Sequence, residues 1–191
     1  NSLNIPAILV SHAVGPRRAF ARLAKWGLRE HDSFGADGAG FVLGNRRVTL
    51  LDLTFAYSTL ARRGLTGGRP LFSNDAIPVL RRMADRDACR LVEDMLCDNT
   101  SRMQSFGAQS VLRFPTHQRT AVKTGTSSNF RDAWVVGYNA THTVGVWVGN
   151  LDGRGMNEAL SVHTAGPVWR RMMDWLATHR RSRGLEPIEA S

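Results

Sequence analysis

The stretch AVKTGTSSNFRDAW, residues 121–134, joins a short apolar strand to a run of small hydroxyl residues and carries one lysine. Of the 25 basic residues in the chain, only Lys25 and Lys123 are lysine. Because side chains alternate along a strand, Lys123 and Gly125 are expected on one face and Thr124 on the other. A lysine beside a glycine gap leaves room for an extended peptide to approach the edge of the strand.

Two further β-type runs follow this strand. The runs TAVKTGT, DAWVVGYN and HTVGVWVGN, at residues 120–126, 132–139 and 142–150, are rich in valine and tryptophan and are separated by short polar loops. Short links predict antiparallel neighbours. Helical patterns lie before and after these runs, so the sequence predicts an α+β fold with an antiparallel sheet flanked by helices.

The expected helices are marked by their ends. The first runs through IPAILVSHAV to Gly15, and the next starts at Pro16 and stops at Gly27. Thr49 resembles the start of a capping box for a helix that stops at Gly64, and Asp85 is the expected cap of another.

The last expected helix lies in AGPVWRRMMDWLATH, residues 165–179, where Pro167 suits a first turn. Its predicted buried face is formed by Val168, Trp169, Met172 and Leu176. IPVLRRM, residues 77–83, is interpreted as an edge strand, and residues 98–109 are interpreted as a polar stretch.

Length and composition favour one globular domain. The chain has 191 residues, 42% of them hydrophobic, and no apolar run of 18 residues that would suit a membrane span. The net charge is +9, but the arginines occur as scattered pairs, and the only run, RRSR at 180–183, has no aromatic residues interleaved with it. A solvated basic surface is therefore favoured over nucleic-acid binding, and the tail at 180–191 is expected to be loose.

Neither cysteine nor histidine indicates a metal or a disulfide. Cys89 and Cys97 are eight residues apart on an expected helix, about 12 Å along its axis, which is too far for a disulfide. The six histidines show neither an H-E-x-x-H pattern nor a Cys/His cluster. The sequence predicts free thiols, no metal and no cofactor.

A second short motif lies at the start of the chain. Ser2 and Asn4, in SLN, precede the K-T-G of residues 123–125 and head a helical segment. S-x-N followed by K-T-G is part of the signature of serine β-lactamases and penicillin-binding proteins. Alone, each motif has an ordinary explanation. S-x-N suits a helix cap, and a lysine such as Lys123 can protect an exposed edge strand from aggregation.

Longer stretches support the enzymatic interpretation. GAGFVLGN, AYSTLARRG and R-D-x-W-x-V-G, at residues 38–45, 56–64 and 131–137, accompany the two short motifs. Together they resemble the transpeptidase domain of class A penicillin-binding proteins, most of all the penicillin-binding protein 1C branch. The resemblance runs from Ser2 to the final helix.

This resemblance implies a penicillin-recognising serine acyltransferase fold that cross-links peptidoglycan stem peptides on the periplasmic face of the cytoplasmic membrane. A serine would attack the carbonyl of a D-Ala-D-Ala end, and an amine from a neighbouring peptide would resolve the acyl-enzyme. β-Lactams would acylate the same serine. The implied partners are stem peptides, β-lactams and the upstream portion of the same protein, with membrane attachment only through an anchor absent from this chain.

The resemblance assigns four catalytic residues. Ser2 would relay a proton near the leaving nitrogen, and Asn4 would hold the substrate amide and the lysine of the nucleophile segment. Lys123 would provide a positive field for that proton transfer and attract the terminal carboxylate. The backbone N–H of Thr126 would supply half of an oxyanion hole.

Substrate binding is assigned to the residues that follow the lysine. Thr124 and Thr126 would bind the carboxylate, Gly125 would leave space for the peptide backbone, and Ser127 would add a hydroxyl. Three further motif residues, Arg131, Asp132 and Trp134, are interpreted as structural, the tryptophan as part of the core.

One part of the family pattern is missing from the chain. Its nucleophile is the serine of S-x-x-K, but Arg22 stands three residues before Lys25 and Thr120 stands three before Lys123. Residues 1–191 are therefore interpreted as the later part of a transpeptidase domain, with the nucleophile expected upstream of Asn1 and the fragment expected to be inactive alone.

Two other functions remain open from the sequence. One is a non-catalytic sensor or scaffold with a penicillin-binding fold. The other is a β-lactamase, although no carboxylate near the motifs suggests itself as a base that could activate water.

Overall fold

A computed structural model of the chain describes residues 2–28, 38–69, 75, 79–115, 117–157 and 160–179. The tail at 180–191, expected to be loose, lies outside the described residues. So do residues 29–37 and 76–78.

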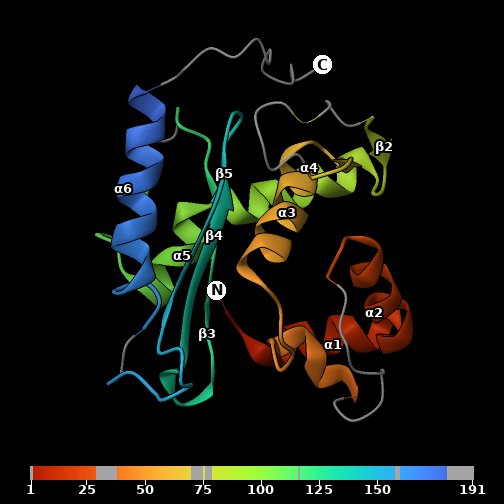
Figure 1. The fold of residues 1–191 in the computed structure, drawn as a ribbon, viewed down its shortest axis with the longest axis horizontal. Helices are drawn as coiled ribbons and strands as arrows, with labels where there is room; N and C mark the ends of the chain where they lie inside the picture. The colour runs from red at the N-terminus through yellow and green to blue at the C-terminus, as the bar shows by residue number, and fades with distance from the viewer. Residues whose placement is uncertain are drawn as a thin grey trace.

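A three-stranded antiparallel sheet forms the centre of the molecule (Figure 1). Its strands are β3 (Ala121–Thr126), β4 (Asp132–Tyr138) and β5 (Thr143–Gly149), in the order β3-β4-β5. Lys123 is paired with Val136 and Gly125 with Trp134. The predicted strands and their antiparallel pairing are confirmed, with each end within one residue of the expected position.

Helices cover both faces of this sheet (Figure 1). On one face lies α6 (Ala165–Thr178). It packs so closely that a Cβ added to Gly137 would come within 2.5 Å of the Trp169 ring. On the other lies α3 (Leu50–Ala61), because a Cβ added to Gly145 would come within 2.1 Å of the Thr54 hydroxyl. The expected layered α+β arrangement is therefore confirmed.

The first two helices and the caps match the sequence signals. α1 (Asn4–Val14) and α2 (Pro16–Lys25) meet at Gly15, whose φ of 89° suits glycine. The hydroxyl of Thr49 accepts a hydrogen bond from the Asp52 N–H at 3.0 Å at the start of α3. Asp85 caps α4 (Arg86–Cys97) through the Ala88 N–H at 2.9 Å. The short 3₁₀ helix η1 (Gly38–Leu43) precedes α3.

Two sequence interpretations differ from the structure. The polar stretch after Asp98 contains a helix, α5 (Asn99–Phe106), which has little apolar pattern but is capped by Asp98 and held by the buried Arg102. In the described part of residues 77–83, the expected edge strand is only the two-residue β2 (Arg81–Arg82), which pairs with β1 (Leu65–Thr66).

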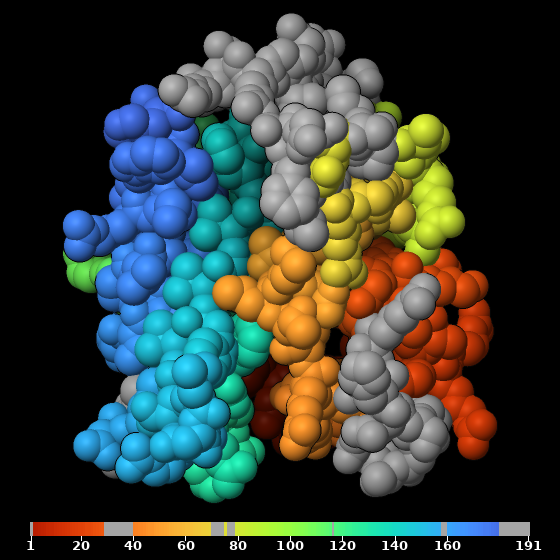
Figure 2. Space-filling model, in the orientation of Figure 1, coloured from red at the N-terminus to blue at the C-terminus, as the bar shows by residue number. Residues whose placement is uncertain are grey.

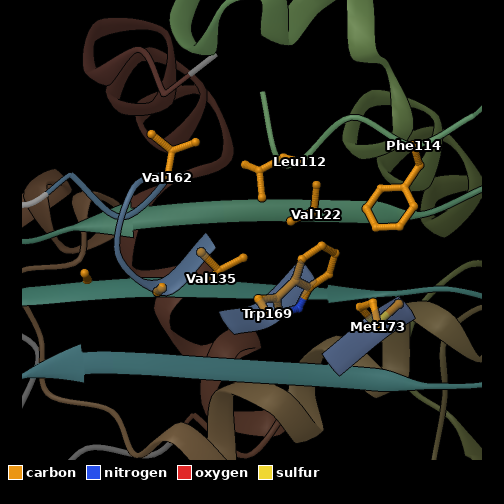
Figure 3. Close-up of a cluster of buried hydrophobic side chains, with 9 residues drawn as sticks. Leu112, Phe114, Val122, Val135, Val162, Trp169 and Met173 are labelled. Atoms are coloured by element: carbon orange, nitrogen blue, oxygen red, sulfur yellow. The ribbon is translucent and has the colours of Figure 1, made fainter. Parts of the chain in front are cut away.

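The main core lies between the sheet and α6. Figure 3 shows Trp169 and Met173 of α6 beside Val122 and Val135 of the strands. Trp169 is fully buried, packs edge-on against Phe114 at 5.8 Å between ring centroids, and donates from its indole N–H to the Val144 carbonyl at 3.0 Å. This packing fixes how α6 is rotated about its axis.

The predicted buried face of α6 is partly wrong. Trp169 is buried as expected, but Val168 and Met172 are 52% and 46% exposed, while Ala165 and Met173 are buried. Residues four apart in a helix lie on one face, so Ala165, Trp169 and Met173 form the row against the sheet. The small Ala165 allows close approach there.

Several large apolar side chains lie at the surface of α1. Ile5, Leu9 and Val10 are 73%, 63% and 63% exposed. A helix that is apolar on all sides is usually buried in a larger core, yet these residues of α1 face outward. On α4, Leu91 and Met95 are exposed in the same way, at 60% and 70%.

Among the residues that the structure describes, no helix combines the length and the apolar character needed to cross a bilayer.

The packing of α6 on the sheet makes Gly137 sensitive to substitution. Gly137→Ala should lower the free energy of unfolding by about 1–3 kcal/mol, because the new Cβ would overlap the Ala121 carbonyl and the Trp169 ring. Gly125→Ala is the matched control, since its Cβ would lie 3.5 Å from that of Trp134, an ordinary contact. Urea unfolding measures both, and equal losses would contradict the close packing of α6 at Gly137.

Candidate functional site

Residues 2 and 123 meet beside the sheet, although 121 positions separate them. The Lys123 Nζ donates a hydrogen bond to the Ser2 hydroxyl and another, of 2.7 Å, to the Thr124 carbonyl. Ser2 precedes α1, whose first turn lies near the strands (Figure 1). In Figure 2 the first described residues, in dark red, lie recessed between the strands and the orange segment that leads to α3.

Burial affects the charge of Lys123. The side chain is half-buried, and this loss of solvation lowers the pKa of Lys123 below the ordinary lysine value. A lysine with a lowered pKa exchanges its proton more readily, while a nearby hydroxyl gives that proton a path. The Lys123–Ser2 pair is therefore suited to moving a proton at the edge of β3.

The open edge of β3 presents backbone groups. The Ser127 N–H donates to the Asp132 carbonyl at 3.0 Å, so the backbone N–H of Ser127 points inward, toward β4. Successive residues of a strand point their backbone groups in opposite directions, which places the N–H groups of Thr124 and Thr126 on the outer edge. In the part of the chain that the structure describes, β3 is an edge strand.

The threonine side chains lie on the face opposite to Lys123. Thr124 and Thr126 line a hollow of about 380 Å³ together with Phe106, Ser161 and His163. The structure thus brings Ser2 to Lys123 on one face and groups both threonines on the other. The two groups adjoin at the edge of β3.

Ser161 is a site residue that the sequence analysis missed. Its side chain is 1% exposed, its hydroxyl donates to the Gly125 carbonyl, and its oxygen lies 2.6 Å from Thr126 Oγ1. Its backbone N–H also donates to Thr126 Oγ1, at 3.3 Å. Ser161 stands in no motif, and only the fold brings its loop to β3.

The remaining predicted binding residues have different surroundings. Ser127 accepts a hydrogen bond from the Asp132 N–H on its hydroxyl at 2.8 Å, which closes the turn after β3. Gly125 lies opposite Trp134, and Asn4 is exposed at the start of α1. The Asn4 side chain, two residues after Ser2, is therefore accessible to solvent.

The motif residues after the turn support the sheet. The Asp132 carboxylate accepts a hydrogen bond from the Trp147 indole at 2.9 Å, and the Trp147 ring lies 6.4 Å from that of Trp134. Trp134 is half-buried rather than fully within the core, because it lies on the Lys123 face beside the Gly125 gap. Arg131 is exposed.

The comparison of sequences identifies the relatives of this chain. No family model matches it. Penicillin-binding protein 1C of Escherichia coli (strain K12) is 34% identical over 154 residues, which make up 80% of this chain. The chain is homologous to the class A penicillin-binding proteins. Penicillin-binding protein 4 of Bacillus subtilis (strain 168) is 27% identical over 188 residues, 89% of this chain.

Solved structures of penicillin-binding proteins share the fold. Penicillin-binding protein 1A from Haemophilus influenzae matches with a TM-score of 0.75 and 18% identity, over 98% of this chain and 35% of that one. Penicillin-binding protein A from M. tuberculosis, an imipenem acyl-enzyme complex, matches with a TM-score of 0.65 and 19% identity, over 91% of this chain and 45% of that one. The predicted fold is confirmed.

This chain corresponds to part of each of these penicillin-binding proteins. It spans 19% of the E. coli relative and 28% of the B. subtilis relative.

The described residues contain no group of three His, Cys, Asp or Glu side chains placed to hold a metal ion. Cys89 and Cys97 are free thiols, and burial raises the pKa of Cys97 to about 11. A thiol with so high a pKa is protonated at neutral pH and is a poor nucleophile.

Proposed function

We propose that this chain forms the later part of a peptidoglycan DD-transpeptidase domain, which cross-links stem peptides through a serine in a preceding segment. The contact between Lys123 and Ser2 carries the proposal. It joins the lysine of K-T-G to the serine of S-x-N, the two motif groups that acyl transfer of this kind requires beside its nucleophile. The homology to penicillin-binding proteins supports the same function.

In the proposed reaction, the serine attacks the carbonyl of a D-Ala-D-Ala end and forms an acyl-enzyme. The Ser2 hydroxyl, hydrogen-bonded to Lys123, relays a proton to the leaving nitrogen. The N–H of Thr126, on the open edge of β3, stabilises the oxyanion. An amine of a neighbouring stem peptide then attacks the acyl-enzyme and completes the cross-link.

The substrate is proposed to lie along β3. Gly125 has no side chain on the Lys123 face, so a peptide backbone can approach the strand. The hydroxyls of Thr124 and Thr126 bind the terminal carboxylate. Asn4 holds the substrate amide, and Ser127 shapes the turn that ends the groove. The lysine ammonium attracts the same carboxylate.

Stem peptides and β-lactams are the proposed ligands, and the upstream portion of the same protein is the proposed partner. A protein of this function acts on the cell wall outside the cytoplasm, and we place it on the outer face of the cytoplasmic membrane. We propose no nucleic-acid ligand.

Labelling of the complete protein with a fluorescent penicillin tests the function. A transpeptidase should bind the label covalently and release it slowly, because its acyl-enzyme reacts with an amine rather than with water. Rapid release of the label would indicate a β-lactamase. Absence of labelling would contradict the proposed activity and favour a sensor or scaffold.

A further inference from the structure

We propose that a second site of this chain, beside the end of α2, binds a phosphate group. The groups that hold the phosphate are the hydroxyl of Thr66 and the guanidinium groups of Arg69 and Arg81. None of these residues takes part in the proposed acyl transfer, so the inference does not rest on that reaction. The phosphate group is carried either by a soluble ester or by a lipid headgroup.

The site is a hollow of about 410 Å³ between the end of α2, α3 and β1. Figure 1 shows α2 on the side of α3 away from the central sheet. The hollow shares no residue with the one that contains Thr124 and Thr126. Ligand pockets commonly measure about 300–1,000 Å³, so this hollow has room for a phosphate and part of the molecule that carries it.

Positive charge predominates in this hollow. The described residues that line it include Lys25, Arg69 and Arg81 but a single carboxylate, Asp52, so three positive charges against one negative leave an excess of two. The Asp52 carboxylate is already bound, because it accepts hydrogen bonds from Arg69 and, at 2.7 Å, from the Thr49 hydroxyl. Within the described part of the chain, Arg81 has neither an acceptor nor a carboxylate partner. A phosphate ester, with a charge of about −1.5 to −2, suits this excess.

Arg69 is held in place without a ligand. Its Nη1 donates to the Asp52 carboxylate, and its guanidinium carbon lies 4.6 Å from the centroid of the Phe55 ring. A Cβ at residue 27 would come within 2.6 Å of Nη2, so Gly27 leaves the space that this group occupies. A guanidinium has five N–H donors in one plane, and the contact with Asp52 uses one of them. The others are free to bind an anion at a low entropic cost, because the side chain is already ordered.

Thr66 contributes a buried hydroxyl to the same hollow. The residue is 6% exposed, yet its hydroxyl has no hydrogen-bond partner among the residues that the structure describes. Buried hydroxyls in proteins are nearly always hydrogen-bonded, so this one indicates a bound group in the hollow. Arg81 is paired with Thr66 across β1 and β2. Paired residues of antiparallel strands point to the same face, which brings the Arg81 guanidinium beside this hydroxyl.

These donors match phosphate better than carboxylate. A phosphate ester presents three acceptor oxygens around one centre, whereas a carboxylate presents two in one plane. The hydroxyl of Thr66 and the guanidinium groups of Arg69 and Arg81 supply one donor group for each phosphate oxygen. Guanidinium groups also bind phosphate through two parallel hydrogen bonds, which adds specificity.

Isothermal titration calorimetry of the complete protein with glycerol phosphate tests the site. Arg81→Met and Thr66→Val should each raise the dissociation constant about tenfold or more, because each removes a hydrogen bond to a charged group. Thr66→Ser keeps the hydroxyl and should restore the affinity. Binding that persists unchanged in Arg81→Met and Thr66→Val would place the phosphate elsewhere and overturn the inference.

Arg82→Met is the matched control, because it removes the same charge one residue away. The Arg82 side chain bonds to the carbonyls of Arg63 and Ala84 at 3.0 and 3.1 Å and does not line the hollow. Its affinity for glycerol phosphate should stay within about twofold of that of the unaltered protein. An equal loss in Arg82→Met and Arg81→Met would show a general attraction by the net charge of +9 and would contradict a built site.

Two further probes define the ligand. Succinate carries two carboxylates and should bind about tenfold more weakly than glycerol phosphate, and equal binding would contradict recognition of phosphate. Dihexanoyl phosphatidic acid carries the same phosphate on a soluble lipid. An affinity about tenfold tighter for this lipid, lost in Arg81→Met, assigns the phosphate to a lipid headgroup, and an equal affinity assigns it to a soluble ester. Binding of neither phosphate probe would overturn the inference.

Discussion

Incubated alone with a β-lactam, the 191-residue chain should gain no mass. Neither Lys25 nor Lys123 has a serine three residues before it, so the chain has no S-x-x-K nucleophile. Ser2, Lys123 and the Thr126 N–H can position a substrate, but loss of a catalytic nucleophile alone costs about 10⁶ in rate. Intact mass spectrometry after incubation measures the result directly.

The control for this experiment is the same chain within its complete protein, treated identically. That protein should gain the mass of one β-lactam. A stoichiometric adduct on the 191-residue chain would instead mean that one of its own residues is the nucleophile. The proposed role of Ser2 would then have to change from proton relay to attacking group.

Replacement of Lys123 should have the second largest effect. In the complete protein, Lys123→Met should lower the acylation rate constant by about 10²–10⁴, the usual contribution of a positioned acid or base. The variant keeps an unbranched side chain that is one atom shorter, and it removes both the charge and the hydrogen bond to Ser2. Time-resolved labelling with a fluorescent penicillin measures the rate.

Lys25→Met is the matched control, because Lys25 is the only other lysine and lies exposed at the end of α2. Its labelling rate should stay within about twofold of the unaltered protein. Lys123→Arg distinguishes charge from proton exchange, since a guanidinium keeps its charge at every accessible pH. Full activity of Lys123→Arg would contradict a role for Lys123 in proton movement.

The pH dependence follows from the lowered pKa of Lys123. The proposed role needs the ammonium form of Lys123. The rate of labelling should therefore decline as the pH rises through the pKa of Lys123, and this decline should start at a lower pH than for a lysine with the ordinary pKa of 10.5. Folding stability changes in the opposite sense. Because the unfolded chain holds the proton to higher pH, stability increases with pH between the native and unfolded pKa values, and Lys123→Met should remove that increase.

The sheet could be predicted from sequence because its pattern is local. The runs around Val122, Val135 and Val146 are rich in β-branched and aromatic residues and are separated by short loops, so both their extent and their pairing follow from neighbouring residues. The caps at Thr49 and Asp85 could be predicted for the same reason. α5 was missed because Arg102, which bonds to the Asn99 side chain at 2.7 Å and to the Leu112 carbonyl at 3.4 Å, replaces the usual apolar stripe.

Only part of the candidate site is visible in the sequence. The motifs indicated Ser2 and Lys123, and the structure brings these two residues into contact. Ser161 could not be predicted, because its importance depends on how the loop before α6 meets β3, 35 residues away in sequence. Rotation of α6 was misjudged for a related reason: Met172 and Met173 are equally apolar, and only the packing of Trp169 decides which one is buried.

The apolar surface of α1 determines how the isolated chain behaves as a colloid. Exposed Ile5, Leu9 and Val10 attract other copies at short range, while a net charge of +9 repels them at long range. Dissolved salt reduces the range of that repulsion to about 10 Å at 0.1 M and leaves the attraction in place. We therefore expect dilute buffers to keep this basic chain dispersed and moderate salt to bring copies together.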